Sequence, residues 1–335
     1  MRNTWYNYKQ VDRAPRKSRN NRAISKYYDN DVHFYGDMEF EGEQHWHIKR
    51  RNVSLEEEIS RGKFAIIFKA KLYSSKNVEE IVVAKTLHED CTELQKTEMK
   101  AKIHFFATKV GHHVNILEFK GSVEDDSRGS MMILEYCKNG TLKQYLDTIR
   151  ECFNTEISDK LARISYQICL GMDYLSSREI VHRRLAARNV LLNHLYEAKI
   201  AGFGPDPEED RTNVNEIHQE NVPVKWVAPE CITSSSNATE LSDAWSYGVV
   251  LWEIYSLGET PYPGINSSEI SDYLKEGERM DKPEYCDATF YKIMKRCWQY
   301  DHRKRLGFAA LKEQMRPLFH QGEGDDIYMQ VLKEV

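Results

Sequence analysis

The side chains best suited to chemistry lie in one short stretch of this 335-residue chain. It contains His182, Arg183, Arg184 and Asn189, and the sequence Gly-Phe-Gly follows at Gly202. Arg184 cannot act as a general base, because a guanidinium stays protonated in proteins. Gly202 has no side-chain oxygen, and Asn189 alone is a poor ligand set for Mg²⁺, which prefers several hard oxygens. The stretch therefore lacks the carboxylates that acid–base or metal-dependent chemistry needs.

Two features upstream are suited to contact with phosphate. Residues 53–59 and 64–72 read as two strands joined by a tight turn at Gly62. A glycine in such a turn lets backbone N–H groups approach a phosphate, because it has no Cβ. The apolar strand 81–84 then ends at Lys85, a cation.

Composition limits the classes of protein that this chain can be. Apolar residues make up 41% and charged residues 30%, which is typical of a soluble globular protein. The net charge of −5 argues against nucleic acid as a partner. The seven cysteines form no Cys-x-x-Cys pair, which favours reduced thiols in the cytosol. No apolar run approaches the length of a membrane span, and the first residues do not resemble a signal peptide.

The stretch at 182–189 resembles the catalytic loop of a protein kinase, His-Arg-Asp-Leu-x-x-x-Asn, and 202–204 resembles the Asp-Phe-Gly turn. Ala-Ala-Arg at 186–188 is similar to the tyrosine-kinase version. In that family the loop Asp accepts the substrate's proton and the turn Asp binds Mg²⁺. Arg184 and Gly202 stand at these positions, and Arg184 is expected to project a cation toward the acceptor hydroxyl. The resemblance thus implies a kinase fold without catalytic residues, and no metal ligands.

The resemblance also implies a nucleotide site. The residues assigned to it are Gly62, Ile67, Ala84, Lys85, Leu134, Glu135, Cys137, Asn189 and Leu191. In the family, the lysine holds the α- and β-phosphates. Leu134 corresponds to the gatekeeper, and the backbone near Glu135 and Cys137 to the adenine-binding hinge. Ile67, Ala84 and Leu191 match residues that enclose adenine, although they suit an ordinary core equally well. Gly62 is the only glycine kept from the family's phosphate-covering loop, so ATP binding is expected to be weak and Mg²⁺ binding is not expected.

A lysine such as Lys85 pairs in active kinases with a glutamate on the next helix. Eight residues before Gly111, where growth-factor receptors carry that glutamate, this chain has Ile103. Glu98 would fit only with a five-residue insertion, so we expect the ion pair to be absent.

Other matched residues are structural in the family. They are His182, Arg183, Phe203, Glu230, Asp243 and Arg305. The resemblance implies that His182 and Phe203 are buried beneath the loop, that Arg183 would receive an activation-loop phosphate, and that Asp243 braces the loop backbone. It further implies an ion pair between Glu230 and Arg305.

The motifs extend over residues 46–318 and are most similar to the fibroblast and vascular endothelial growth-factor receptor branch. They imply an α+β bilobal protein kinase fold. The expected N-lobe, 46–137, has an antiparallel five-stranded sheet plus one helix, and the expected C-lobe, 138–318, is mainly helical. A helix is predicted at 159–177 from its apolar periodicity. Residues 1–45 are expected to be disordered and juxtamembrane-like, and 319–335 to form a tail.

These flanking segments suggest partners. The basic run at 2–26 would gain about 1 kcal/mol per Lys or Arg at an anionic membrane surface, or would simply be a solvated tail. Tyr28, Tyr35 and Tyr328 have spacings typical of phosphotyrosines bound by SH2-containing adaptors, although such short patterns also occur in ordinary loops. The acidic segment 206–210 is a candidate partner for Arg183, Arg184 or Arg188, or else a solvated loop.

The sequence therefore favours a tyrosine-kinase-like pseudokinase that acts as a signalling scaffold or as an allosteric partner of other kinases. Two alternatives remain open: a weak or unconventional ATP-dependent protein tyrosine kinase, and a metal-independent nucleotide-sensing switch. The expected location is cytoplasmic, either as a free protein or as the cytoplasmic portion of a membrane receptor.

Overall fold

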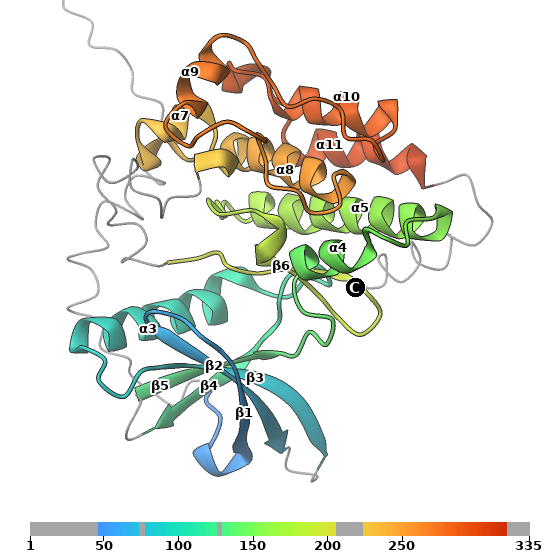
Figure 1. The fold of residues 1–335 in the computed structure, drawn as a ribbon. Coiled ribbons are helices and arrows are strands. Elements are labelled where there is room, and N and C mark those ends of the chain that lie inside the picture. Colours follow the sequence, from blue (N-terminus) through green and yellow to red (C-terminus); the bar gives the residue numbers. More distant parts are fainter. Residues whose placement is uncertain (1–45, 74–77, 126–128, 206–223, 320–335) are drawn as a thin grey trace, which may run out of the picture. The chain divides into compact units, whose positions relative to one another are not determined.

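The computed structural model describes residues 46–73, 78–125, 129–205 and 224–319. An antiparallel five-stranded sheet with one long helix is followed along the chain by a mainly helical part (Figure 1). The predicted fold class is thereby confirmed. The predicted segment 1–45, the predicted tail 319–335 beyond residue 319, the tyrosines of both, and the acidic segment 206–210 lie outside the described residues.

The sheet contains β1 (Val53–Arg61), β2 (Ala65–Tyr73), β3 (Glu79–Leu87), β4 (Phe119–Asp125) and β5 (Gly129–Glu135). Its order is β1-β2-β3-β5-β4, and every neighbouring pair is antiparallel. Side chains alternate between the two faces of a strand, and one face forms a small core of its own. That core contains Val53, Ala70, Val82, Ala84, Val123, Met131 and Ile133. Leu87, Met132 and Leu134 belong instead to the larger core that continues into the helical part.

Helix α3 (Glu93–Phe105) packs mainly on β5. Thr92 and Gln95 form a capping box at its start, which satisfies two backbone N–H groups that would otherwise lack a partner. Ile103 is buried, as an apolar side chain on the packed face of the helix should be. The helix continues without a break into a π-helical turn, η3 (Phe106–Val110), so that Phe105 and Phe106 both reach the interior.

The helical part is built around α8 (Glu240–Tyr255), which is buried from Ser242 to its end and packs against α5 (Thr155–Ser177) and α10 (Ala288–Cys297). The predicted helix at 159–177 is therefore confirmed, and it begins four residues earlier than predicted, at Thr155, with Asn154 as its cap. The remaining helices and strands are α4 (Leu142–Ile149), β6 (Val190–Leu192), β7 (Ala198–Ile200), α7 (Pro229–Ile232), α9 (Ile270–Lys275) and α11 (Phe308–Met315). Short 3₁₀ turns are η2 (Arg50–Asn52), η4 (Ala187–Asn189), η6 (Val224–Trp226), η7 (Ser235–Asn237), η8 (His302–Lys304) and η9 (Arg316–Leu318).

Two predictions from composition can be compared with this fold. All seven cysteines are free thiols, as the absence of paired spacings suggested. Within the described ranges, no helix is both long and apolar enough to cross a bilayer.

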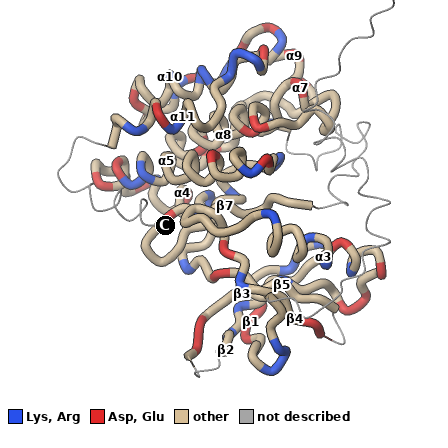
Figure 2. The backbone as a smooth tube through the Cα atoms, turned by 180° about the vertical axis from the view of Figure 1, so that it is seen from behind, with Lys and Arg blue, Asp and Glu red and all other residues tan. Residues whose placement is uncertain are grey.

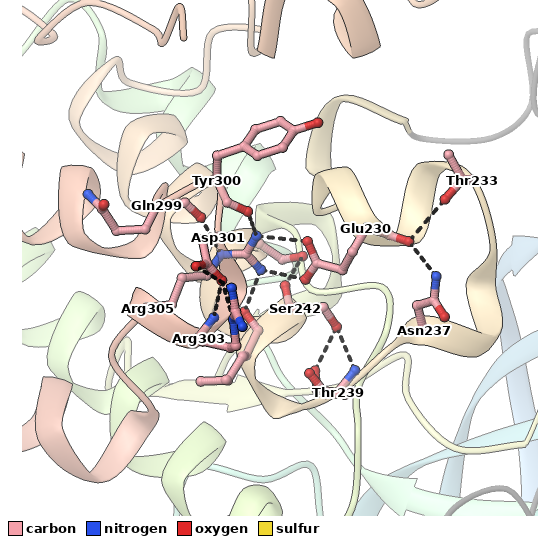
Figure 3. A network of polar contacts seen from close by, with 12 residues as sticks. Glu230, Thr233, Asn237, Thr239, Ser242, Gln299, Tyr300, Asp301, Arg303 and Arg305 are labelled. Atoms are coloured by element: carbon pink, nitrogen blue, oxygen red, sulfur yellow. Dashed lines mark hydrogen bonds and ion pairs between the residues drawn. The ribbon is translucent and has the colours of Figure 1, made fainter. Parts of the chain in front are cut away.

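The predicted ion pair between Glu230 and Arg305 is present in the helical part (Figure 3). The guanidinium donates to both carboxylate oxygens, at 2.6 and 2.7 Å. It also donates to the carbonyls of Gln299 and Leu241 and lies 5.0 Å from the Trp245 ring centroid. Its side chain is 0% exposed, so the charge depends entirely on these partners.

Lys and Arg are interspersed with Asp and Glu along the described backbone (Figure 2). On the sheet they form cross-strand pairs, such as Lys69 with Glu57 and Lys71 with Glu79. Partly exposed pairs of this kind contribute about 0–1 kcal/mol each. Of these ion pairs, the buried one between Arg305 and Glu230 is therefore expected to contribute most to stability.

Replacing Arg305 by methionine should lower the free energy of unfolding of the full chain by about 3–5 kcal/mol, because the Glu230 carboxylate loses its counter-charge in a mostly buried site. Arg303→Met is the matched control. Its side chain is 79% exposed and, among the described residues, pairs with Asp301 alone, so a loss of less than about 1 kcal/mol is expected. Urea unfolding of both variants measures the difference, and equal losses would contradict the structural role of the pair.

Candidate functional site

Asp243 on α8 holds the backbone of the loop at 182–189. Its two carboxylate oxygens accept the N–H groups of His182 at 2.6 Å and Arg183 at 2.8 Å. Arg183 has φ +71°, a left-handed conformation that a non-glycine residue adopts only with support. Burial raises the pKa of Asp243 to about 7, although both N–H bonds oppose that shift. The predicted bracing role is confirmed.

Glu253, ten residues after Asp243 on α8, is a second buried carboxylate beneath the loop. It accepts the N–H of Ala187 and the indole N–H of Trp226, each at 2.9 Å. Burial raises its pKa to about 7. Arg188 in turn lies 4.4 Å from the Trp226 ring centroid. Sequence analysis missed Glu253. The available signal was an acidic residue within the apolar run of α8.

His182 and Phe203 form the predicted buried pair, at 1% and 0% exposure. The His182 Nδ1 accepts the N–H of Arg184 at 3.2 Å, and its Nε2 bonds the carbonyl of Ala201 at 3.0 Å, which suits the neutral ring with its proton on Nε2. Burial, and secondly the charge of Arg184, lower the pKa of His182 to about 3. The histidine is thus a structural link between loop and turn.

The side chain of Arg184 lies against the turn at 202–204. Its Nε donates to the carbonyl of Gly202 at 3.2 Å and its Nη2 to the carbonyl of Gly204 at 3.4 Å. We expected this cation to project toward an acceptor hydroxyl. Among the described contacts it binds the two turn carbonyls, which the several donors of a guanidinium fork can reach together.

Asn189 fills the space beside Gly202. A Cβ added at Gly202 would lie 2.8 Å from the Asn189 Cγ and 2.9 Å from its Oδ1, and Gly202 has φ +79°. The Asn189 amide is held there because its Nδ2 donates to the carbonyl of Arg184 at 2.6 Å. In the part of the chain that the structure describes, no group of three or more His, Cys, Asp or Glu residues is arranged to hold a metal. One amide with a neighbouring guanidinium does not fit Mg²⁺.

One face of the sheet carries the side chains of Lys85, Ile67, Val83 and Leu134. Lys85 lies opposite Ile67, and Val83 lies opposite Leu134, and directly opposed residues point the same way. Ala84 lies on the other face, fully buried in the small core. Its assignment to the nucleotide site was therefore wrong, because residues i and i+2 of a strand, not neighbours, share a face. Val83, and not Ala84, shares the sheet face of Lys85.

The turn at Gly62 is closed by bonds within the protein. Its N–H donates to the carbonyl of Ala65, and its carbonyl bonds His88 Nε2, both at 2.9 Å. A Cβ at Gly62 would meet only Ala65 O at 3.5 Å, an ordinary contact. The fold therefore does not require glycine here.

The predicted hinge is connected to the strand that precedes the turn at 202. Glu135 pairs with Lys199 of β7 at 3.0 Å and accepts the N–H of Glu118. Cys137 is buried, and Leu191 of β6, which lies opposite Lys199, is half-buried. Burial raises the pKa of the Cys137 thiol to about 12, so it stays protonated.

Comparison with known proteins agrees with this geometry. Residues 53–315 match the model of the protein tyrosine and serine/threonine kinase family. The chain is 33% identical over 328 residues to Fibroblast growth factor receptor homolog 2 of Drosophila melanogaster, covering 88% of this chain and 30% of that protein. It is 31% identical to Tyrosine kinase receptor Cad96Ca of the same organism (82% and 37% covered) and to Vascular endothelial growth factor receptor 1 of Mus musculus (84% and 26% covered). The chain thus spans 26–37% of the length of these relatives.

The depressed pKa of His182 should appear in the pH dependence of stability. The unfolded chain takes up a proton at this residue near its ordinary pKa of 6.5, whereas the folded chain resists until about 3. As the pH is lowered from 6.5 to about 3, the free energy of unfolding should therefore fall. His182 contributes up to about 1.4 kcal/mol per pH unit to this slope. In His182→Phe the slope should be shallower by that amount.

Denaturant unfolding at a series of pH values measures both slopes. His113, whose pKa burial lowers to about 4, is present in both proteins and so contributes equally. Identical slopes would contradict the buried, neutral state of His182.

Proposed function

The chain belongs to the family of protein tyrosine and serine/threonine kinases, and we propose that it signals within this family without transferring phosphate. The observation that carries the proposal is the position of Arg184. It stands where the family has its catalytic base, and its guanidinium donates to the Gly202 and Gly204 carbonyls. General-base catalysis contributes on the order of 10²–10⁴ in rate, and a permanently protonated side chain cannot provide it.

A second loss supports the same proposal. The metal-binding position is Gly202, and Asn189 occupies the space that a side chain there would need. Losses within one catalytic unit do not simply multiply, but each one removes a step that phosphoryl transfer requires. By contrast, the bonds from Asp243, Glu253 and Arg305 keep the loop and the helical part assembled.

An assembled kinase fold without catalysis can still present surfaces to partners. We propose that the partners are other kinases, activated by docking, or SH2-containing adaptors that bind Tyr28, Tyr35 or Tyr328 once these are phosphorylated. The basic segment 2–26 is proposed to contact an anionic membrane surface. The relatives named as receptors favour a chain that acts as the cytoplasmic portion of a membrane receptor.

A second candidate function is a metal-independent nucleotide-sensing switch. It is favoured by three apolar side chains that are only half-buried: Ile67 and Val83, which share a sheet face with Lys85, and Leu191 of β6. A nucleotide that prefers one arrangement of the two lobes would shift the population toward it.

We expect the full chain, given MgATP and a tyrosine-containing peptide, to incorporate phosphate no faster than its Lys85→Met variant. The variant is the matched control because it removes the lysine that holds phosphates in this family and leaves Arg184 and Gly202 in place. Radiolabelled phosphate in the peptide measures the rate. Transfer by the natural chain that disappears in Lys85→Met would overturn the proposal in favour of a weak, unconventional kinase.

Nucleotide binding separates the remaining functions. Calorimetric titration of ATP into the full chain should give weak binding that is the same with Mg²⁺ and with EDTA, because the described residues offer no cluster of ligands for magnesium. An absence of heat at millimolar ATP would contradict this and leave the scaffold alone. Binding that requires Mg²⁺ would contradict the metal-free site.

A further inference from the structure

We propose that Arg184 serves as a built-in cation that ties the turn at 202–204 to the loop at 182–189, so that Phe203 stays packed in the interior without nucleotide or metal. The inference rests on the contacts of Arg184, and it holds whether or not the chain transfers phosphate.

Arg184 joins the two segments through its backbone and its side chain together. Its N–H donates to His182 Nδ1, and its carbonyl accepts the Asn189 amide. Its guanidinium donates to the carbonyls of Gly202 and Gly204. At 3.2 and 3.4 Å these two bonds are long, and they link loop and turn chiefly by bringing one positive charge to both carbonyls.

The two carbonyls flank Phe203, so fixing them fixes the phenyl ring. Phe203 lies 5.0 Å from Phe106, 6.4 Å from Phe105 and 5.6 Å from His182, measured between ring centroids. Gly204 allows this approach: at φ +88° a Cβ there would lie 2.9 Å from the Phe105 ring. The turn, helix α3 and the loop therefore pack as one unit. Among the described contacts, Arg184 is the only cation that donates to the turn carbonyls.

The geometry also explains why Gly202 and Asn189 accompany Arg184. A side chain at Gly202 would displace Asn189, whose amide supports the Arg184 carbonyl. The three residues thus form a consistent set, in which the arginine fork supplies positive charge to the turn and the glycine leaves room for the amide.

The test is amide hydrogen exchange, read by mass spectrometry on the full chain. In Arg184→Met, peptides that cover 200–205 should exchange at least about tenfold faster than in the natural chain, which converts to about 1.4 kcal/mol of lost local opening free energy. Arg184→Lys keeps the charge but not the fork, so its exchange should lie between the two. Peptides from α8 should be unchanged in every variant.

The matched control is Arg163→Met, which makes the same change at an exposed position of α5. It should leave exchange at 200–205 unaltered. Unchanged exchange in Arg184→Met would overturn the proposal. So would a natural chain whose turn exchanges faster in EDTA, because the turn would then depend on a metal and not on the arginine.

Discussion

The geometry of the site depends on one buried carboxylate, Asp243. It lies on a helix that is buried along nearly its whole length, and it accepts two consecutive N–H groups of the loop. Those bonds hold Arg183 in a left-handed conformation, which turns His182 into the core and places Arg184 beside the turn. Without this acceptor, buried N–H groups would be left unsatisfied, at a cost of about 1–3 kcal/mol each. The loop is therefore anchored in the most deeply buried helix of the fold.

This anchoring explains how the fold and the catalytic residues can change independently. Asp243 and Glu253 bind backbone N–H groups, which every residue except proline supplies. Exchanging the side chains at 184 and 202 therefore leaves the supporting bonds in place. The same holds for Arg305, whose partners lie in the helical part. A kinase fold can lose its carboxylates at the site and still be held together by the carboxylates beneath it.

The sequence predicted what ordered motifs can specify and missed what only tertiary contacts decide. The sheet, the Arg305 pair and the bracing by Asp243 followed from residues at family positions. Ala84 was misplaced because a one-residue shift in a strand moves a side chain to the opposite face. The contacts of Glu253 and the direction of the Arg184 side chain could not be predicted, because both depend on groups brought close only by folding.

Arg184 and Gly202, in place of two aspartates, change the electrostatics that stabilise the loop and the turn in this kinase fold. Two carboxylates at the loop and the turn would repel each other, and a bound cation relieves such repulsion. Here one of those positions carries a cation and the other carries no side chain. No carboxylate pair at positions 184 and 202 therefore requires a cation to relieve its repulsion. We propose that the arginine that donates to the Gly202 and Gly204 carbonyls supplies this positive charge from within the chain. In this proposal the assembled arrangement of loop, turn and helix α3 is set by contacts within the chain.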